Sequence, residues 1–303
     1  MWPFEASTQS LWLGLYLATF ALHAVFVSSV AIGSAYALVR KDELAGKLRD
    51  WLPFMLGAGI TAGVAPLLFL QLLYQRRFYT ANLLLGPRWA AVVPALIVGF
   101  YALYLAKASV RWCRPALGLG LACFLFVAWS WTELHQLMLA EPAWRAMYAA
   151  GDRLYADASI VPRLGMWLGA MAALFALVAA HLAPSRLVAL IALKGLVLAT
   201  VCALVIGWSD AHGWAYILVA AVAVAAGAWG VMLATPHRGL PIATGATAAA
   251  LVAGAVVREA PRLAFLEPVH AEAAGAGGLP VFAITLAIGV AAIAWIVRTV
   301  RAA

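Results

Sequence analysis

Residues 11–39 read LWLGLYLATFALHAVFVSSVAIGSAYALV, and this stretch decides the fold. It carries no charged side chain. As a helix rising about 1.5 Å per residue, it exceeds the roughly 30 Å hydrocarbon core of a bilayer. One imidazole, His23, lies near its middle. The other apolar segments of the chain repeat this length, so we predict an all-α integral membrane protein whose helices bundle around residues 11–39.

The composition excludes an ordinary soluble domain and a disordered chain, because 66% of the residues are hydrophobic and only 11% are charged. The first apolar segment has no basic n-region and no small-residue cleavage site, which favours a retained helix over a signal peptide. The net charge of +8 is typical of basic cytoplasmic loops, so we expect no nucleic-acid partner. No CxxC or CxxCH accompanies the three cysteines, so neither a disulfide framework nor a c-type haem attachment site is expected.

The chain reads as one transmembrane domain over residues 1–303. Prolines stand at or near most segment ends, where they interrupt a helix. The seventh and eighth segments are rich in alanine and glycine, which favours close packing in the bundle interior or against a partner. The nine predicted spanning helices cover residues 11–39, 52–75, 88–107, 115–139, 161–183, 187–208, 214–235, 240–258 and 279–300.

Basic residues are distributed unequally between the two sets of loops. One set, with the C-terminal tail, carries eleven basic residues against three acidic ones, whereas the opposite set carries eight of each. Cytoplasmic loops of membrane proteins carry the excess of lysine and arginine. The sequence therefore predicts an N terminus outside and a C terminus in the cytoplasm.

Polar residues interrupt the fourth segment, which ends WSWTELHQLML. Glu133 and Gln136 are three residues apart and share a helix face, while His135 points elsewhere. One interpretation is a ligand site or proton relay, because ionisable groups at membrane depth are usually functional. The other is an interfacial helix end, where polar residues and tryptophans are common.

His23 lies about 18 Å along its helix, deeper than His135, so we do not expect the two imidazoles to share a metal ion. One interpretation of His23 is an axial haem ligand that uses a neutral imidazole nitrogen. The other is a histidine hydrogen-bonded to a neighbouring helix, and both stay open.

Two groups of charges adjoin outer helix ends. Each is interpreted either as a site for lipid headgroups or a partner subunit, or as plain solvated boundary charges. The first is an aromatic-basic turn and the second follows the eighth segment: Arg76, Arg77, Phe78 and Tyr79; Arg258, Glu259 and Arg262.

Several stretches together resemble subunit I of the cytochrome bd quinol oxidases. Residues 17–39, LATFALHAVFVSSVAIGSAYALV, resemble the family's first helix, with His23 in the place of a haem-ligating histidine. The next two helices of that family resemble GAGITAGVAPLLFLQLLYQ and GPRWAAVVPALIVGFYALYLAK. The stretch AGAVVREAPR is similar to the end of the family's eighth helix. Nine helices and an outer N terminus also agree, and the resemblance implies a multi-pass protein of a bacterial-type inner (cytoplasmic) membrane.

The chain departs from that family at most haem-binding and quinol-binding positions. The family's acidic residue of helix two falls on Gln71, and its haem-ligating histidine of helix five falls on or beside Trp167. The large quinol-binding loop is reduced to SDAHG. His23 is the main ligand retained, with Glu259 and Arg262 as further retained polar residues. The resemblance therefore implies one haem b, with His23 iron ligation, or no haem.

The resemblance implies an integral subunit of a respiratory or electron-transfer complex, a scaffold that anchors cytochrome partners while catalysis belongs to the complex. Its expected partners are membrane lipid and other integral membrane subunits, with a c-type cytochrome on the outer face and quinone as candidates. Two alternatives stay open: a single-haem b-type quinol-interacting cytochrome, and a small-solute or metal-ion transporter. The candidate proton-relay, quinol-binding or structural residues are Glu133, His135, Gln136, Gln71, Glu259 and Arg262.

Overall fold

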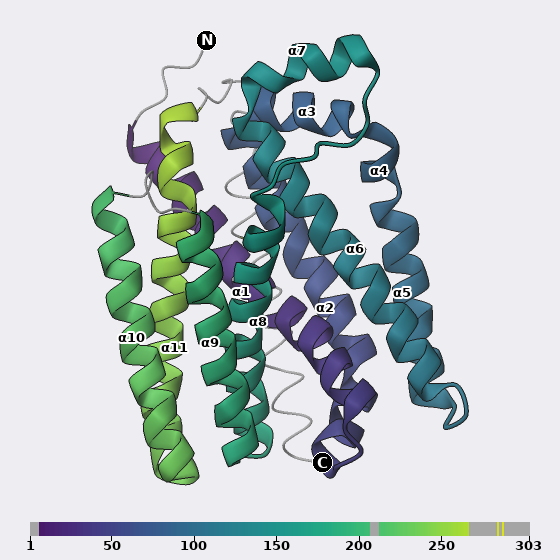
Figure 1. The fold of residues 1–303 in the computed structure, drawn as a ribbon, viewed down its shortest axis with the longest axis vertical. Helices are drawn as coiled ribbons and strands as arrows, with labels where there is room; N and C mark the ends of the chain where they lie inside the picture. Colours follow the sequence, from purple (N-terminus) through teal and green to yellow (C-terminus); the bar gives the residue numbers. More distant parts are fainter. Residues whose placement is uncertain (1–5, 207–211, 267–283, 285–286, 288–303) are drawn as a thin grey trace.

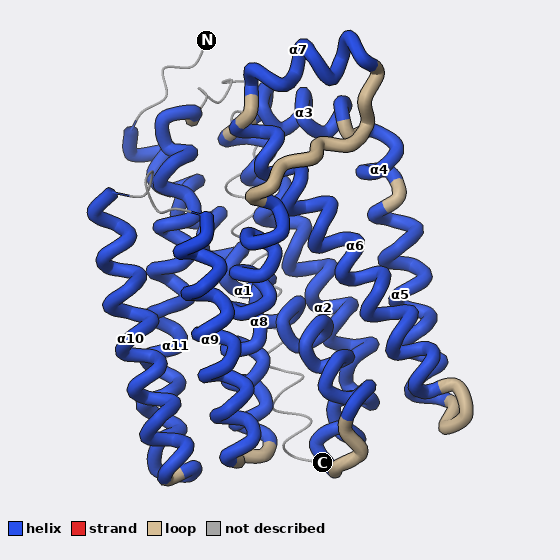
Figure 2. Tube along the Cα trace, in the orientation of Figure 1, coloured by secondary structure: helices blue, strands red, loops and turns tan. Residues whose placement is uncertain are grey.

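The structure, a computed structural model, describes residues 6–206 and 212–266, together with Ile284 and Ala287. Within these residues every regular element is helical and there is no strand (Figure 2). Eight helices there are long and apolar enough to cross a membrane, which confirms a multi-pass helical membrane protein. The predicted ninth segment, 279–300, lies outside the described residues except at Ile284 and Ala287, so the count of nine stays a prediction.

The boundaries of the eight described spans agree with the sequence prediction to within a few residues except at the start of α2. That helix begins at Glu43 rather than at 52, and the segment expected over 88–107 is divided into α4 and α5. Two helices were not predicted, α3 and α7. The elements are α1 (Ala6–Val39), α2 (Glu43–Leu73), α3 (Gln75–Leu84), α4 (Gly86–Ala90), α5 (Val92–Ala108), α6 (Cys113–Leu139), α7 (Glu141–Ala150), α8 (Ile160–Leu182), α9 (Arg186–Ile206), α10 (His212–Ala234), α11 (Pro236–Glu259) and the 3₁₀ helix η1 (Ala260–Phe265).

Helix α1 is the centre of the bundle, as its sequence predicts. It packs against α2, α6, α8 and α11, and the remaining long helices extend outward on either side of it (Figure 1). Its side chains Tyr16, Val30 and Tyr36 are almost fully buried. An uncharged helix with bulky apolar groups on several faces is stabilised by neighbours all round, so α1 takes the interior position.

The early start of α2 has a local cause in Asp42. The Asp42 carboxylate accepts a 2.9 Å hydrogen bond from the Ala45 backbone N–H and so caps the helix. Leu44, Ala45 and Leu48 then face the core, while Glu43 and Lys47 form an exposed ion pair one turn apart. The charged stretch before residue 52 therefore continues the helix beyond its apolar part rather than forming a loop.

Helices α3 and α7 lie across one end of the bundle, which we call the α3/α7 end (Figure 1). Each buries one face: Phe78, Ala81 and Leu84 in α3, and Trp144 and Met147 in α7. These spacings of three residues are typical of an amphipathic helix on an apolar surface. Both helices are too short and too polar to cross a membrane, which is why a search for long apolar runs does not find them.

Helices α8 and α9 cross at two glycines. A Cβ built on Gly169 would stand 2.5 Å from the Gly195 carbonyl oxygen, and a Cβ on Gly195 would stand 2.5 Å from the Gly169 oxygen. Real Cβ contacts are never this short, so the crossing excludes any other residue type. Glycine permits such close approach of backbones in helical membrane proteins.

The alanine-rich and glycine-rich helices α10 and α11 form the flank of the bundle beside α9 (Figure 1). The prediction that they pack in the interior is wrong, because their spans are the least buried of the eight. They pack closely against each other instead, where the Trp229 indole N–H donates a 3.0 Å hydrogen bond to the Thr247 hydroxyl. Gly227, Gly230 and Gly245 face open space. Packing of this flank against a partner stays a prediction.

Candidate functional site

Six polar side chains from four parts of the chain meet inside the α3/α7 end, and we call them the polar cluster. They come from α1, from the junction of α2 and α3, from α6, and from the end of α11 with η1. Three of them, His135, Glu259 and Arg262, belong to the candidate set predicted from the sequence. The members are Tyr16, Tyr74, His135, Arg258, Glu259 and Arg262.

Glu259 joins the arms of the polar cluster. Its Oε1 accepts a 2.5 Å hydrogen bond from the Tyr74 hydroxyl, and its Oε2 accepts bonds of 3.3 Å from both Arg258 and Arg262. The Glu259 side chain is only 2% exposed. Burial, and then the adjacent Glu259 charge, raise the pKa of Tyr74, so its phenol stays protonated and remains a donor. A buried carboxylate is thus fully partnered by two cations and one hydroxyl.

Arg258 connects α11 to two other helices. One terminal nitrogen donates to the Tyr16 hydroxyl at 2.7 Å, and the other donates to Nε2 of His135 at 2.7 Å. The guanidinium lies 4.4 Å from the ring centre of Phe20 and 5.5 Å from that of Trp167. These aromatic rings cover the cation by cation–π contact. Trp167, at or beside the position where the resembled family has a haem-ligating histidine, thus contacts an arginine.

Glu133 and Gln136 lie in α6 with His135 but bind other partners, outside the polar cluster. The Glu133 carboxylate forms a 2.8 Å ion pair with Arg88 of α4 and accepts a 2.7 Å hydrogen bond from the Tyr155 backbone N–H. The Gln136 amide donates to the Ser159 hydroxyl at 3.0 Å. These bonds tie the connection between α7 and α8 to the surface of α6.

Both groups of charges that were interpreted as outer turns contain buried side chains. The Arg258, Glu259 and Arg262 side chains are each less than one-tenth exposed, so the solvated interpretation is wrong for them. Arg77 is buried in α3 and not in a turn, pairs with Glu141 at 2.8 Å, and lies 3.9 Å from the ring centre of Phe265. The position of a charged residue near a helix end does not predict whether another part of the chain will bury it.

Gln71 was predicted as a site residue, whereas Tyr16 and Tyr74 of the polar cluster were not. Gln71 is half-buried in the last turn of α2, three residues before Tyr74. Tyr16 and Tyr74 were missed by the sequence analysis, because tyrosines at membrane boundaries are common as interfacial anchors. Their wide separation in sequence from Arg258 and Glu259 left no local signal of the pairing.

His23 lies against α2, in a groove formed by Gly59 and Gly63. Its Nδ1 is 2.8 Å from the Gly59 carbonyl oxygen, so Nδ1 carries the hydrogen and Nε2 holds the lone pair. A Cβ on Gly63 would stand 2.8 Å from two atoms of the imidazole ring. This contact agrees with the interpretation of His23 as a histidine hydrogen-bonded to a neighbouring helix.

Only Nε2 of His23 is left to ligate a haem iron, because Nδ1 is bonded to the Gly59 carbonyl oxygen. A histidine that donates through Nδ1 to a backbone carbonyl is oriented to offer Nε2 to a metal. In the part of the chain that the structure describes, no group of three or more His, Cys, Asp or Glu side chains is placed to hold a metal ion. Neither of the two cavities described next borders His23. Haem ligation by His23 therefore stays a prediction.

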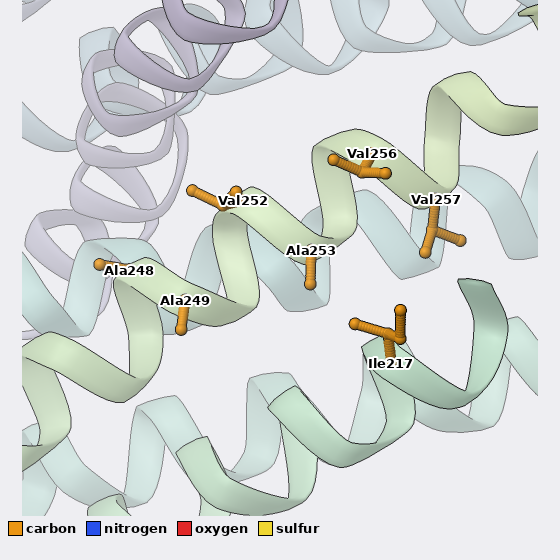
Figure 3. Close-up of a pocket in the computed structure, with 7 residues that line it drawn as sticks. All are labelled: Ile217, Ala248, Ala249, Val252, Ala253, Val256 and Val257. Atoms are coloured by element: carbon orange, nitrogen blue, oxygen red, sulfur yellow. The ribbon is translucent and has the colours of Figure 1, made fainter. Parts of the chain in front are cut away.

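One cavity lies between α10 and α11, toward the end of α11 (Figure 3). Its volume is about 520 Å³, and every side chain that lines it is apolar. A second cavity, of about 60 Å³, adjoins the N-terminal half of α2, away from the α3/α7 end. The groove offers no hydrogen-bonding or titratable group, so it can hold only an apolar chain or side chain. Its lining residues are Ile217, Ala248, Ala249, Val252, Ala253, Val256 and Val257.

Comparison with known proteins finds no family model that matches this sequence and no curated protein that is similar to it.

Proposed function

We propose that this chain is an integral membrane subunit of a respiratory or electron-transfer complex, with a scaffold like that of cytochrome bd quinol oxidase subunit I. In this role it anchors cytochrome partners in the membrane, and catalysis belongs to the assembled complex. The resemblance in the sequence and the arrangement of the resembling segments support the proposal.

The observation that carries the proposal is the convergence of three resembling segments on the polar cluster. Tyr16 lies one residue before the stretch that resembles the first helix, Tyr74 lies at the end of the segment that resembles the second helix, and Glu259 lies in AGAVVREAPR. Tyr16 is bonded to Arg258 of that last segment, and Tyr74 to its Glu259. Segments far apart in sequence therefore meet at the polar cluster, which contains Glu259 and Arg262, two of the residues that the resemblance marks as retained.

The finer parts of the proposal concern the membrane and the partners. The basic loops between α1 and α2, α5 and α6, and α8 and α9 lie at the end opposite the α3/α7 end (Figure 1). We infer that this basic end faces the cytoplasm of a bacterial-type inner membrane. The α3/α7 end then faces outward, where a c-type cytochrome would dock and where quinol would approach.

The proposal is tested by isolating the tagged chain from its native membranes in mild detergent. We expect co-purifying integral subunits and cytochromes, together with a reduced-minus-oxidised haem spectrum of the assembly. A chain that purifies alone, without any haem-containing partner, would refute the proposal. Transport of a solute by that isolated chain in liposomes would favour the transporter alternative.

A second candidate is a single-haem b-type cytochrome that interacts with quinol, favoured by the free Nε2 of His23. This candidate is supported if the purified chain has a b-type haem spectrum and the His23→Ala variant does not. Thr19→Ala is a matched control, because Thr19 lies one turn away in α1 and bonds only carbonyls of its own helix. If the wild-type chain has no haem spectrum, the cytochrome candidate is rejected and only the scaffold role remains.

A further inference from the structure

The polar cluster carries one more positive charge than its own groups neutralise. Arg258 and Arg262 share a single carboxylate, Glu259. A guanidinium has only hydrogen-bond donors, so Nε2 of His135 must accept from Arg258 and carry no proton. His135 is therefore neutral, and the nearby Glu133 is paired with Arg88. Among the residues that the structure describes, one positive charge remains without a counter-charge in this buried site, where an uncompensated ion is costly.

The same cluster holds hydrogen-bond donors that have no acceptor. Three buried nitrogen atoms lack a partner in the described part of the chain: Nε of Arg258, Nε of Arg262 and Nδ1 of His135. Each of them carries a hydrogen. The Tyr16 hydroxyl accepts from Arg258, so its own hydrogen is free to point elsewhere. A surplus of donors together with a surplus positive charge matches an anion and excludes a cation.

The packing limits the size of that anion. Phe20 and Trp167 cover the guanidinium of Arg258, and the unpartnered Nε atoms of Arg258 and Arg262 are buried, so only a small ion fits beside them. The surplus of a single charge corresponds to one monovalent ion. The cluster lies at the α3/α7 end of the bundle, so an ion reaches it from water without crossing the hydrocarbon core.

We propose that the polar cluster is a binding site for one small monovalent anion, a halide such as chloride, held by the unpartnered Nε groups of Arg258 and Arg262. The ion neutralises the surplus charge and locks the ends of α1, α6 and α11 together. This role goes beyond the proposed function and does not depend on it, because it involves no electron transfer and no partner subunit.

The test is equilibrium binding of radioactive chloride to the purified full chain in detergent. We expect one saturable site per chain, with competition by bromide and none by the larger gluconate. In parallel, replacing gluconate by chloride at constant ionic strength should raise the thermal unfolding midpoint with the same saturation, because a ligand that binds only the folded state stabilises it.

Variants assign the site to the cluster. Arg262→Gln removes the surplus charge and should weaken chloride binding at least tenfold, while Arg262→Lys keeps the charge and should retain binding. Arg145→Gln, an exposed arginine of α7 at the same end, is the matched control and should bind chloride as the wild type does. No saturable chloride binding by the wild-type chain, or unchanged binding in Arg262→Gln, would overturn the proposal. If Arg262→Gln does not fold, the direct measurement on the wild type and Arg262→Lys still decides.

Discussion

The Tyr74 hydroxyl donates a 2.5 Å hydrogen bond to Oε1 of Glu259, which joins residues 185 positions apart in the sequence. The bond ties the end of α2 to the end of α11 inside the α3/α7 end, and both partners are buried. Through Glu259 it also orders Arg258 and Arg262. Tyr74, at the junction of α2 and α3, therefore connects these two helices to the end of α11.

Replacing Tyr74 by Phe should destabilise the protein by about 1–3 kcal/mol, because it leaves a buried carboxylate oxygen without its donor. The measurement is thermal or denaturant unfolding in detergent. Tyr79→Phe removes the same hydroxyl from an exposed site in α3 and is the control. Equal stability of the two variants would contradict the role of the buried bond.

Replacing Gly63 by Ala should destabilise the protein by about 1–3 kcal/mol, because the added methyl group overlaps the His23 ring. Gly57→Ala is the control in the same helix, since a Cβ there meets nothing within 4 Å. A double variant with His23→Ala should recover part of the loss, because the clashing ring is then absent. Strictly additive losses in that cycle would show that the two residues do not press on each other.

The crossing of α8 and α9 should tolerate little added volume. Gly195→Ala places a methyl group against the Gly169 carbonyl oxygen and Ala172, and we expect a loss of about 3 kcal/mol or failure to fold. Gly230→Ala on the open flank of α10 should be neutral or slightly stabilising, since alanine favours helix more than glycine does. Yield of monodisperse protein and the unfolding midpoint both report the difference.

Replacing Arg88 by Met should release the connection between α7 and α8. The variant leaves Glu133 as a buried, unpaired carboxylate, which costs about 3–5 kcal/mol for a buried ion pair. We expect faster limited proteolysis around residues 151–158 than in the wild type. Adding Glu133→Gln should restore protection, because its amide oxygen still accepts from the Tyr155 N–H while the unpaired charge is gone. Failure of that second change to restore protection would argue against the ion pair as the cause.

The same connection should loosen in acid. Hydrogen bonds from the Ser159 hydroxyl and backbone N–H lower the pKa of Asp157 below its ordinary 3.8. A lowered folded-state pKa means that this stabilisation is complete above the ordinary pKa and is lost as pH falls through the lowered value. Pepsin cleavage at residues 151–158 should therefore accelerate below about pH 4 more steeply in the wild type than in Asp157→Asn. Parallel pH profiles would exclude Asp157 as the titrating group.

The sequence by itself determined the class of the protein and the extent of most of its spans. Long uncharged runs have no soluble alternative, since their backbone groups must be satisfied inside a helix when water is absent. The same reasoning placed residues 11–39 at the centre of the bundle, as the structure has them. It also selected His135, Glu259 and Arg262 as polar groups worth explaining.

Only the tertiary structure decided how these groups are used. Whether Glu259 is solvated or buried depends on its contacts with Tyr74 at the end of α2 and with Arg262 of η1, which no local sequence pattern predicts. The bonds from Tyr16 to Arg258 and from Tyr74 to Glu259 span 242 and 185 residues, and no local pattern encodes such pairs. The flank position of α10 and α11 was likewise missed, because small residues permit close packing without naming the surface they pack against.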